Sequence, residues 1–281
     1  IDREHHLLGS VPLLSLLLCD ENTLVSDIME DDAQLISVNT LDDREYVADI
    51  VSKYDLLSVP VTDNEGRLVG IVTIDDAVDV MEEEVTEDFE KMAAVTPSED
   101  TYFKTGVFKH AKNRIVWLIF LMLASIITGN VLSMYENAFA AVPVLVAFVP
   151  LLMGTGGNCG AQASTLVIRG LSQDEIKMKD FLKVWWKEIR VAVVVGITLA
   201  LINAVRIFIQ YGAGQMELAL VVGLTLVLVA MLAKSLGCIL PMLAKKLKLD
   251  PAIMASPLIT TIVDTCSVLV YFNLAVIILG L

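Results

Sequence analysis

Cysteine is scarce in this chain of 281 residues, and charge is missing from long stretches of it. The four cysteines are Cys19, Cys159, Cys238 and Cys266, and none forms a C-x-x-C pair or another spacing typical of metal ligands. Three of them lie in apolar runs, where cysteine usually acts as a small hydrophobic residue. The composition therefore excludes a disulfide scaffold and argues against a structural zinc site.

Basic residues are nearly absent from the first hundred positions, which hold 26 Asp and Glu against 5 Lys and Arg. The remaining residues hold 8 acids and 15 bases, so a net charge of 5 − 26 = −21 is followed by one of 15 − 8 = +7. Phosphate would repel the acidic part, so no nucleic-acid partner is expected. The contrast indicates two physically different parts, and it excludes a single globular domain.

Long uncharged stretches in the second part are long enough to span a bilayer, which takes about 20 apolar residues. Five such stretches cover residues 115–134, 141–168, 191–209, 218–240 and 252–281, and none carries more than one charge. Lys and Arg lie before the first stretch, between the second and third, and between the fourth and fifth. We therefore predict five helices in the lipid bilayer of the cell membrane, with the N-terminus in the cytoplasm and the C-terminus outside.

Strand and helix signals alternate in the acidic part. Strands are expected at residues 35–38, 58–62 and 67–73, the last two joined by a DNEG turn. Thr40 is a candidate cap for a helix over residues 41–54, with Asp43 at the capping-box position. The pattern predicts a small α/β domain over residues 26–80.

An internal repeat links LLGSVPLLSLLL of residues 7–18 to LVGIVTIDDAVD of residues 68–79. The pattern resembles CBS domains, which occur in tandem pairs, and residues 1–25 would be the remnant of a first unit that begins upstream. GIVTIDD in the second copy resembles the CBS signature whose hydroxyl and acid hold a nucleotide ribose. Thr73 and Asp76 are therefore candidates for binding a nucleotide such as ATP, and the alternative is that they only cap a helix.

A strongly acidic helix is expected from Asp75 to Met92, because apolar and acidic residues both recur every three or four positions. Like charges at this spacing repel each other. Either this face is simply solvated, or divalent cations such as Mg²⁺ or Ca²⁺ neutralise it. Residues 75–112 would then form a connecting helix and linker that pass cation-dependent movement to a transmembrane domain at residues 113–281.

Three ionisable residues fall within the predicted membrane stretches, where such residues are functional candidates by default. Arg206 and Lys234 lie close enough to the ends of their stretches to snorkel, so we interpret both as mainly structural. Asp264 lies deep in the last stretch, and its side chain is too short to reach the surface. It marks either an ion pathway or an ion pair with Arg206 or Lys234.

Polar residues accompany Asp264 in the last stretch and recur in the second. Thr260, Thr261 and Ser267 share a helical face with Asp264, and Pro257 frees a backbone carbonyl that can face water. The second stretch reads GTGGNCGAQ, and its glycines allow close backbone approach or break the helix. The predicted pore-lining residues are Gly156, Gly157, Asn158, Gln162 and Pro257. The alternative for the glycines is close helix packing.

One carboxylate per chain is too little to hold a bare Mg²⁺, which prefers six oxygens and gives up water reluctantly. A two-fold dimer would bring two Asp264 carboxylates to one axis, where they could hold a mostly hydrated ion. The order of parts resembles the MgtE family of magnesium channels, and LLMGTGGNCGAQ and PLITTIVD are similar to motifs of that family. The resemblance implies an α-helical membrane protein with an α/β cytosolic CBS domain, joined by a long acidic connecting helix.

The same resemblance implies a homodimer with one pore on the two-fold axis. Asp264 would be the pore carboxylate, Thr260, Thr261 and Ser267 its neighbours, and Asp250 would lie at the cytoplasmic mouth. Regulatory Mg²⁺ sites would fall on Asp43, Glu45, Asp55, Asp76, Asp79, Glu84, Glu87 and Asp88. The implied mechanism is Mg²⁺ import under negative feedback, in which bound Mg²⁺ draws the CBS domains together and the connecting helix closes the inner mouth.

Two other functions compete with a channel. A proton- or Na⁺-coupled divalent cation carrier would use Asp264 as its coupling site. A membrane-anchored nucleotide sensor would use the helices only as an anchor. The sequence contains no Walker loop, catalytic Ser/His/Asp arrangement or histidine cluster, so no enzyme is expected.

Overall fold

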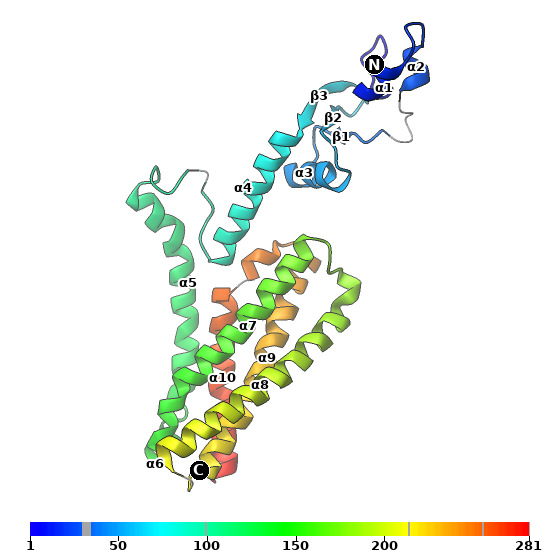
Figure 1. Ribbon diagram of the computed structural model, residues 1–281. Helices are drawn as coiled ribbons and strands as arrows, with labels where there is room; N and C mark the ends of the chain where they lie inside the picture. Colours follow the sequence, from blue (N-terminus) through cyan, green and yellow to red (C-terminus); the bar gives the residue numbers. More distant parts are fainter. Residues whose placement is uncertain (30–34, 99, 213, 255, 281) are drawn as a thin grey trace. The chain divides into compact units, whose positions relative to one another are not determined.

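The computed structural model describes residues 1–29, 35–98, 100–212, 214–254 and 256–280. The chain forms two compact units, Ile1–Thr86 and Glu87–Leu281. The first unit carries a small sheet with its helices, and the second is helical (Figure 1). The predicted fold class, a helical membrane protein with an α/β domain and an acidic connecting helix, is confirmed.

A three-stranded sheet in the order β1-β2-β3 organises the first unit. Strand β1 (Val38–Asn39) is parallel to β2 (Ser58–Thr62), which pairs antiparallel with β3 (Leu68–Thr73) as the predicted hairpin. Strand β1 is shorter than the segment 35–38 suggested. The buried core consists of Val38, Val47, Ala48, Val51, Val59 and Ala77. Apolar residues of the strands therefore pack against α3 (Arg44–Lys53) and the first turns of α4.

Asp43 caps α3, which corrects the prediction of Thr40 as the cap. The Asp43 carboxylate accepts a hydrogen bond from the backbone N–H of Glu45 at 2.9 Å. A turn precedes the helix, in which Asp42 accepts from the backbone N–H of Asn39 at 2.7 Å. This turn uses residues that the sequence pattern assigned to the helix, so the helix starts three residues later than expected.

The short helices α1 (Leu13–Leu18) and α2 (Val25–Ile28) lie in the segment interpreted as a first repeat. An isolated bridge between His6 and Arg67 joins this segment to the rest of the first unit. Helix α4 (Ile74–Met92) is continuous over 19 residues and ends at Met92, as the two stripes predicted. It crosses the boundary between the two units.

The second unit consists of helices. They are α5 (Val107–Ser133), α6 (Glu136–Ala141), η1 (Pro143–Phe148), α7 (Val149–Ser172), η2 (Met178–Asp180), α8 (Phe181–Tyr211), α9 (Met216–Lys246), η3 (Pro251–Met254) and α10 (Ser256–Leu279). Among the described residues, five segments are long and apolar enough to cross a membrane, those of α5, α7, α8, α9 and α10. Several run beyond the apolar stretches because backbone hydrogen bonding continues into their charged ends.

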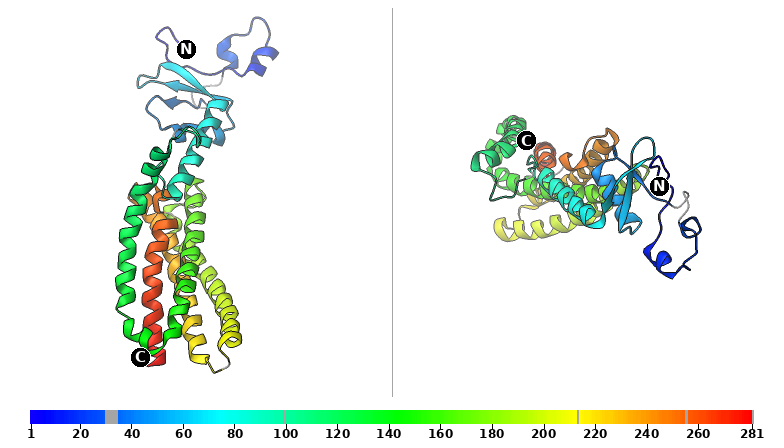
Figure 2. Two further views of the ribbon diagram at one scale, coloured as in Figure 1. Left: turned by 90° about the vertical axis from the view of Figure 1, so that its left-hand side faces the viewer. Right: turned by 90° about the horizontal axis from the view of Figure 1, so that it is seen from above.

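Helix α9 packs against α7, α8 and α10, whereas α5 contacts α10 along one side of the bundle (Figure 2). Glycines allow the closest approaches. A Cβ at Gly237 of α9 would lie 2.5 Å from the backbone oxygen of Gly160 in α7. A Cβ at Gly160 would lie 2.6 Å from Ile259 of α10. The glycine-rich segment of α7 is therefore wedged between α9 and α10, and α7 itself is an unbroken helix.

Candidate functional site

Asp264 lies on α10, about 12 Å along the helix from Ser256 at a rise of 1.5 Å per residue. Its side chain is half-buried and forms no hydrogen bond or ion pair with any described residue. The alternative partners are engaged elsewhere, because Lys234 pairs with Glu188 and the Arg206 guanidinium lies 5.6 Å from the ring centre of Phe148. The predicted alternative of an ion pair with Asp264 is therefore wrong for this chain.

Two threonine hydroxyls lie one turn before Asp264. Both Thr260 and Thr261 donate to the backbone oxygen of Pro257, each at 2.9 Å. Pro257 stands in the first turn of α10, where a proline fits without breaking the helix. The hydroxyls therefore satisfy the Pro257 carbonyl, and their oxygen lone pairs remain able to accept hydrogen bonds from the water molecules of a hydrated ion.

Ser267 lies differently from the other predicted members of this face. It is 1% exposed, and its hydroxyl donates to the Val263 oxygen at 2.7 Å. A Cβ at Gly156 would approach this hydroxyl to 2.9 Å, so Ser267 faces the glycine segment of α7. Within one chain, Ser267 is a packing residue between α7 and α10.

A hydrogen bond that the sequence did not suggest joins α5 to α10. The hydroxyls of Thr128 and Thr265 lie 2.6 Å apart, and Thr128 is buried. Thr265 directly follows Asp264, so this bond fixes the helix backbone next to the carboxylate. The only sequence signal for Thr128 is that it is a polar residue within the otherwise mostly apolar stretch 115–134.

The predicted pore-lining residues of α7 divide between two faces. Gly156 and Gly157 are buried against α9 and α10, and a Cβ at Gly157 would lie 3.0 Å from Thr260. Asn158 and Gln162, one turn apart, are exposed. Two amide side chains therefore lie on the open face of a helix with the length and apolarity of a membrane span.

A buried ion pair lies between α8 and α9. Lys234 is 3% exposed and Glu188 9%, and Lys234 Nζ lies 3.5 Å from Glu188 Oε2. The expectation that Lys234 snorkels is wrong, because α9 continues to Lys246 and places Lys234 about 18 Å from that end. Glu188 lay outside the predicted membrane stretch, so the sequence gave no reason to pair the two residues.

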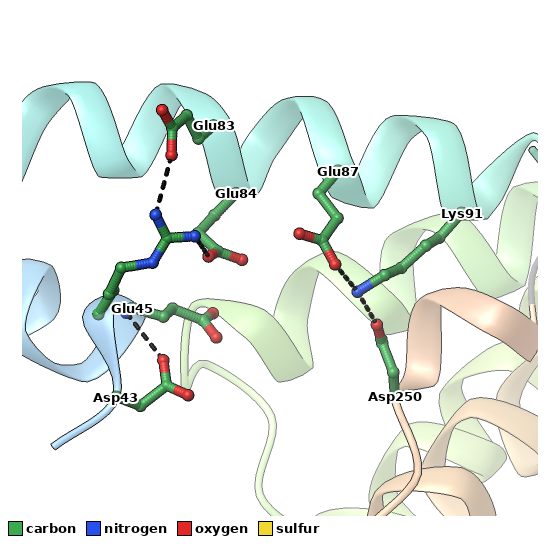
Figure 3. Close-up of polar contacts among 8 residues, drawn as sticks. Asp43, Glu45, Glu83, Glu84, Glu87, Lys91 and Asp250 are labelled. Carbon is green, nitrogen blue, oxygen red and sulfur yellow. Dashed lines mark hydrogen bonds and ion pairs between the residues drawn. The ribbon is translucent and has the colours of Figure 1, made fainter. Parts of the chain in front are cut away.

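Lys91, the only base of α4, bridges Glu87, a predicted regulatory Mg²⁺ ligand, and Asp250, which was predicted at the cytoplasmic mouth of the pore. Its Nζ lies 2.5 Å from Glu87 and 2.7 Å from Asp250 (Figure 3). Burial lowers the pKa of the Lys91 ammonium, but hydrogen bonds and charges of Asp250 and Glu87 outweigh burial and raise that pKa above its usual value. Burial raises the pKa of Asp88 nearby, and the Asp250 carboxylate raises it further.

The other predicted regulatory acids lie in the first unit and are spread along its surface. Glu45, Asp55, Asp76 and Asp79 are exposed, and Asp43 is the cap of α3. Arg44 contacts Glu83 at 3.2 Å and Glu84 at 4.0 Å, so one guanidinium partly neutralises the acidic helix (Figure 3). In the described part of a single chain, no three His, Cys, Asp or Glu residues are grouped so that they could hold a metal ion.

The candidate nucleotide residues contact each other at the start of α4. The Thr73 hydroxyl donates to the Asp76 carboxylate at 3.0 Å. A hydrogen bond from the Thr73 side chain, with backbone N–H groups, lowers the pKa of the neighbouring Asp75. This arrangement matches the helix-capping alternative, and it also places a hydroxyl and a carboxylate side by side.

Comparison with known proteins gives two family matches. Residues 149–274, from α7 to α10, match the family model of the MgtE divalent cation transporter, and residues 25–83 match the CBS domain model. Over 275 residues the chain is 37% identical to the magnesium transporter MgtE of Thermus thermophilus and 36% identical to that of Bacillus subtilis. It is 35% identical over 277 residues to that of Enterococcus faecalis.

These alignments cover 98% of this chain but only 59–60% of the relatives, so the chain spans about three fifths of their length. Matches among the solved structures include the following two. The soluble part of a magnesium transporter is 45% identical over 30% of this chain and 32% of that chain, with a TM-score of 0.29. The cytosolic domain of the Mg²⁺ channel MgtE in complex with ATP is 42% identical over 28% of this chain and 32% of that chain, with a TM-score of 0.27.

Five membrane-length helices among the described residues, one of them with a carboxylate that has no described partner, follow a CBS domain and define a multi-span membrane protein. Residues 149–274 carry a transporter domain of the MgtE family model, behind a CBS domain at residues 25–83.

Proposed function

We propose that the chain is the Mg²⁺-conducting part of a channel or transporter that imports Mg²⁺. The proposal rests mainly on Asp264. This half-buried carboxylate lies in a membrane-length helix and has no partner among the described residues. Carboxylates in membrane spans select cations, and an unpaired one is too costly to retain there without a function. Curated relatives that are 35–37% identical are named magnesium transporters, which supports Mg²⁺ as the ion.

A homodimer completes the site in this proposal. A single chain offers one carboxylate, and hydrated Mg²⁺ needs more negative charge to be selected. The exposed Asn158 and Gln162 support a second copy, because amide side chains facing lipid would be left unsatisfied. In the assembled dimer the two Asp264 side chains would face each other across the axis, with the Thr260 and Thr261 hydroxyls nearby.

Regulation is proposed to act through the acidic part. In the proposed dimer, the regulatory acids of two chains would approach each other and bind Mg²⁺ when its cytosolic concentration is high. Nine acids against one base in α4 support this, because such a helix is strongly repelled by a second copy unless cations intervene. The proposal keeps the N-terminus cytoplasmic and the C-terminus outside, and it keeps ATP as the expected ligand at Thr73 and Asp76.

The test is Mg²⁺ uptake into proteoliposomes by the unaltered chain, Asp264→Asn and a control, Glu217→Gln. Glu217 is an exposed acid in the first turn of α9. We expect uptake by the unaltered chain and the control, and loss of uptake in Asp264→Asn. Equal uptake by both variants would show that the pathway does not use Asp264.

The competing carrier function predicts different currents. A channel gives currents that reverse at the Mg²⁺ equilibrium potential and do not depend on the proton or Na⁺ gradient. A coupled carrier with Asp264 as its coupling site shifts the reversal potential when pH or Na⁺ is changed on one side. Measuring this shift in planar bilayers decides between the two.

A further inference from the structure

A basic and apolar face of α8 lies at the transition from the charged to the uncharged part of that helix. Lys187, Arg190, Val191, Val194 and Val195 line a shallow, open hollow of about 310 Å³. Their spacing of three, one, three and one residues puts all five on one helix face. Residues 191–205 carry no charge, so the two cations lie at one end of the hollow and the valines continue into the apolar stretch.

Neither cation has an acidic partner within the described ranges. Lys187 and Arg190 are both exposed and form no ion pair or hydrogen bond with a described residue. The basic residue one turn earlier differs, because Lys183 pairs with Asp180 at 3.2 Å. The buried Glu188 between the two cations is paired with Lys234. Two free positive charges therefore remain at the mouth of an apolar hollow.

The surroundings fit the boundary between lipid headgroups and acyl chains. Trp186, one helical turn before Arg190, is 56% exposed, and tryptophan is enriched where membranes meet water. Val194 is 66% exposed within a segment long and apolar enough to cross a bilayer. A ligand for this hollow needs a negative group at one end and an apolar body at the other.

We propose that Lys187, Arg190 and the valine face of α8 form a binding site for an anionic phospholipid. The negative phosphodiester of the lipid would lie between the Lys187 ammonium and the Arg190 guanidinium, which presents a planar fork of donors to phosphate oxygens. The first acyl carbons lie along Val191 and Val194. A zwitterionic lipid fits less well, because its own cation faces the two basic side chains.

The test titrates phosphatidylglycerol against the purified full chain in detergent and counts bound lipids by native mass spectrometry, with phosphatidylcholine in parallel. K187Q/R190Q removes both charges, and we expect about 25-fold weaker phosphatidylglycerol binding, or about fivefold for each cation lost. V194W keeps both charges but fills the hollow, and we expect a loss of similar size. K179Q/K183Q, which removes two nearby basic residues outside the hollow, should stay within about twofold of the unaltered chain.

Three results would overturn the proposal. If K187Q/R190Q and K179Q/K183Q weaken phosphatidylglycerol binding equally, the lipid responds only to the overall positive charge near the start of α8. Equal binding of phosphatidylcholine would remove the need for an anionic headgroup. Competition by millimolar inorganic phosphate, with V194W unaffected, would make the site one for a small anion. Thermal unfolding of each variant checks folding, and all four altered cations are exposed.

Discussion

The Lys91 ammonium and the Asp250 carboxylate lie 2.7 Å apart, although 159 positions separate them in the chain. Asp250 directly precedes η3, and α10, the helix that carries Asp264, follows η3 in the chain. Through Lys91, the last turn of the acidic helix α4 is therefore bound to the segment that precedes α10, the helix that carries Asp264. A metal ion between Glu87 and Asp250 would have to displace this ammonium.

Replacing Lys91 tests whether its ammonium group stabilises the C-terminal end of α4. In Lys91→Gln, Glu87 and Asp250 lose their shared counter-charge and repel each other. We expect faster hydrogen exchange at residues 87–92 in Mg²⁺-free buffer, and recovery of protection when Mg²⁺ is added. Lys112→Gln, an exposed lysine of α5, is the control. Unchanged exchange in Lys91→Gln would mean that apolar packing holds this turn.

The Glu188–Lys234 pair predicts non-additive energetics. Glu188→Gln or Lys234→Met alone leaves a buried charge without its partner, which costs about 3–5 kcal/mol in the free energy of unfolding. The double variant leaves no buried charge, so we expect it to lie within about 1 kcal/mol of the unaltered chain. Unfolding by SDS titration in mixed micelles measures this cycle. Additive losses would show that the two side chains act independently.

The close crossing of α7 and α9 predicts a strong effect of one added methyl group. In Gly237→Ala the new Cβ meets the Gly160 backbone oxygen at 2.5 Å and the Ser164 backbone nitrogen at 3.1 Å. Backbone atoms cannot move aside cheaply, so we expect a loss of about 1–3 kcal/mol.

Gly223→Ala in the same helix is the matched control, because its Cβ meets only Ala200 at an ordinary 3.5 Å. The midpoint of thermal unfolding in detergent compares the two variants. A Gly237→Ala protein as stable as Gly223→Ala would contradict the close packing of α7 and α9.

Because Asp43 caps α3, we expect its replacement to lower the stability of the first unit whether or not a metal ion is present. Asp43→Ala removes the acceptor for the Glu45 N–H and should destabilise the first unit by about 1 kcal/mol. Asp79→Ala, at an exposed position of α4, should not destabilise it. Both are compared by thermal unfolding in the presence of EDTA. If Asp43 acts only as a Mg²⁺ ligand, the two variants will behave alike under these conditions.

Local sequence patterns were sufficient for much of this molecule. The β2–β3 hairpin and the end of α4 at Met92 follow from strand composition, turn residues and helical periodicity. The membrane-length helices follow from apolar length. Helix ends were less predictable, because capping depends on the turn before the helix. The turn at Asn39 and Asp42 moved the cap from Thr40 to Asp43.

The sequence by itself determined the membrane-length apolar stretches, the acidic helix and the place of Asp264 within the last stretch, since hydropathy and periodicity are properties of contiguous residues. Only the tertiary structure decided which charges meet. Lys234 is buried against Glu188, and Lys91 reaches Asp250, because the helices that carry these residues pack with particular faces together. Ser267 turned toward Gly156 for the same reason. Pairing across helices depends on their rotation and depth, which no local pattern contains.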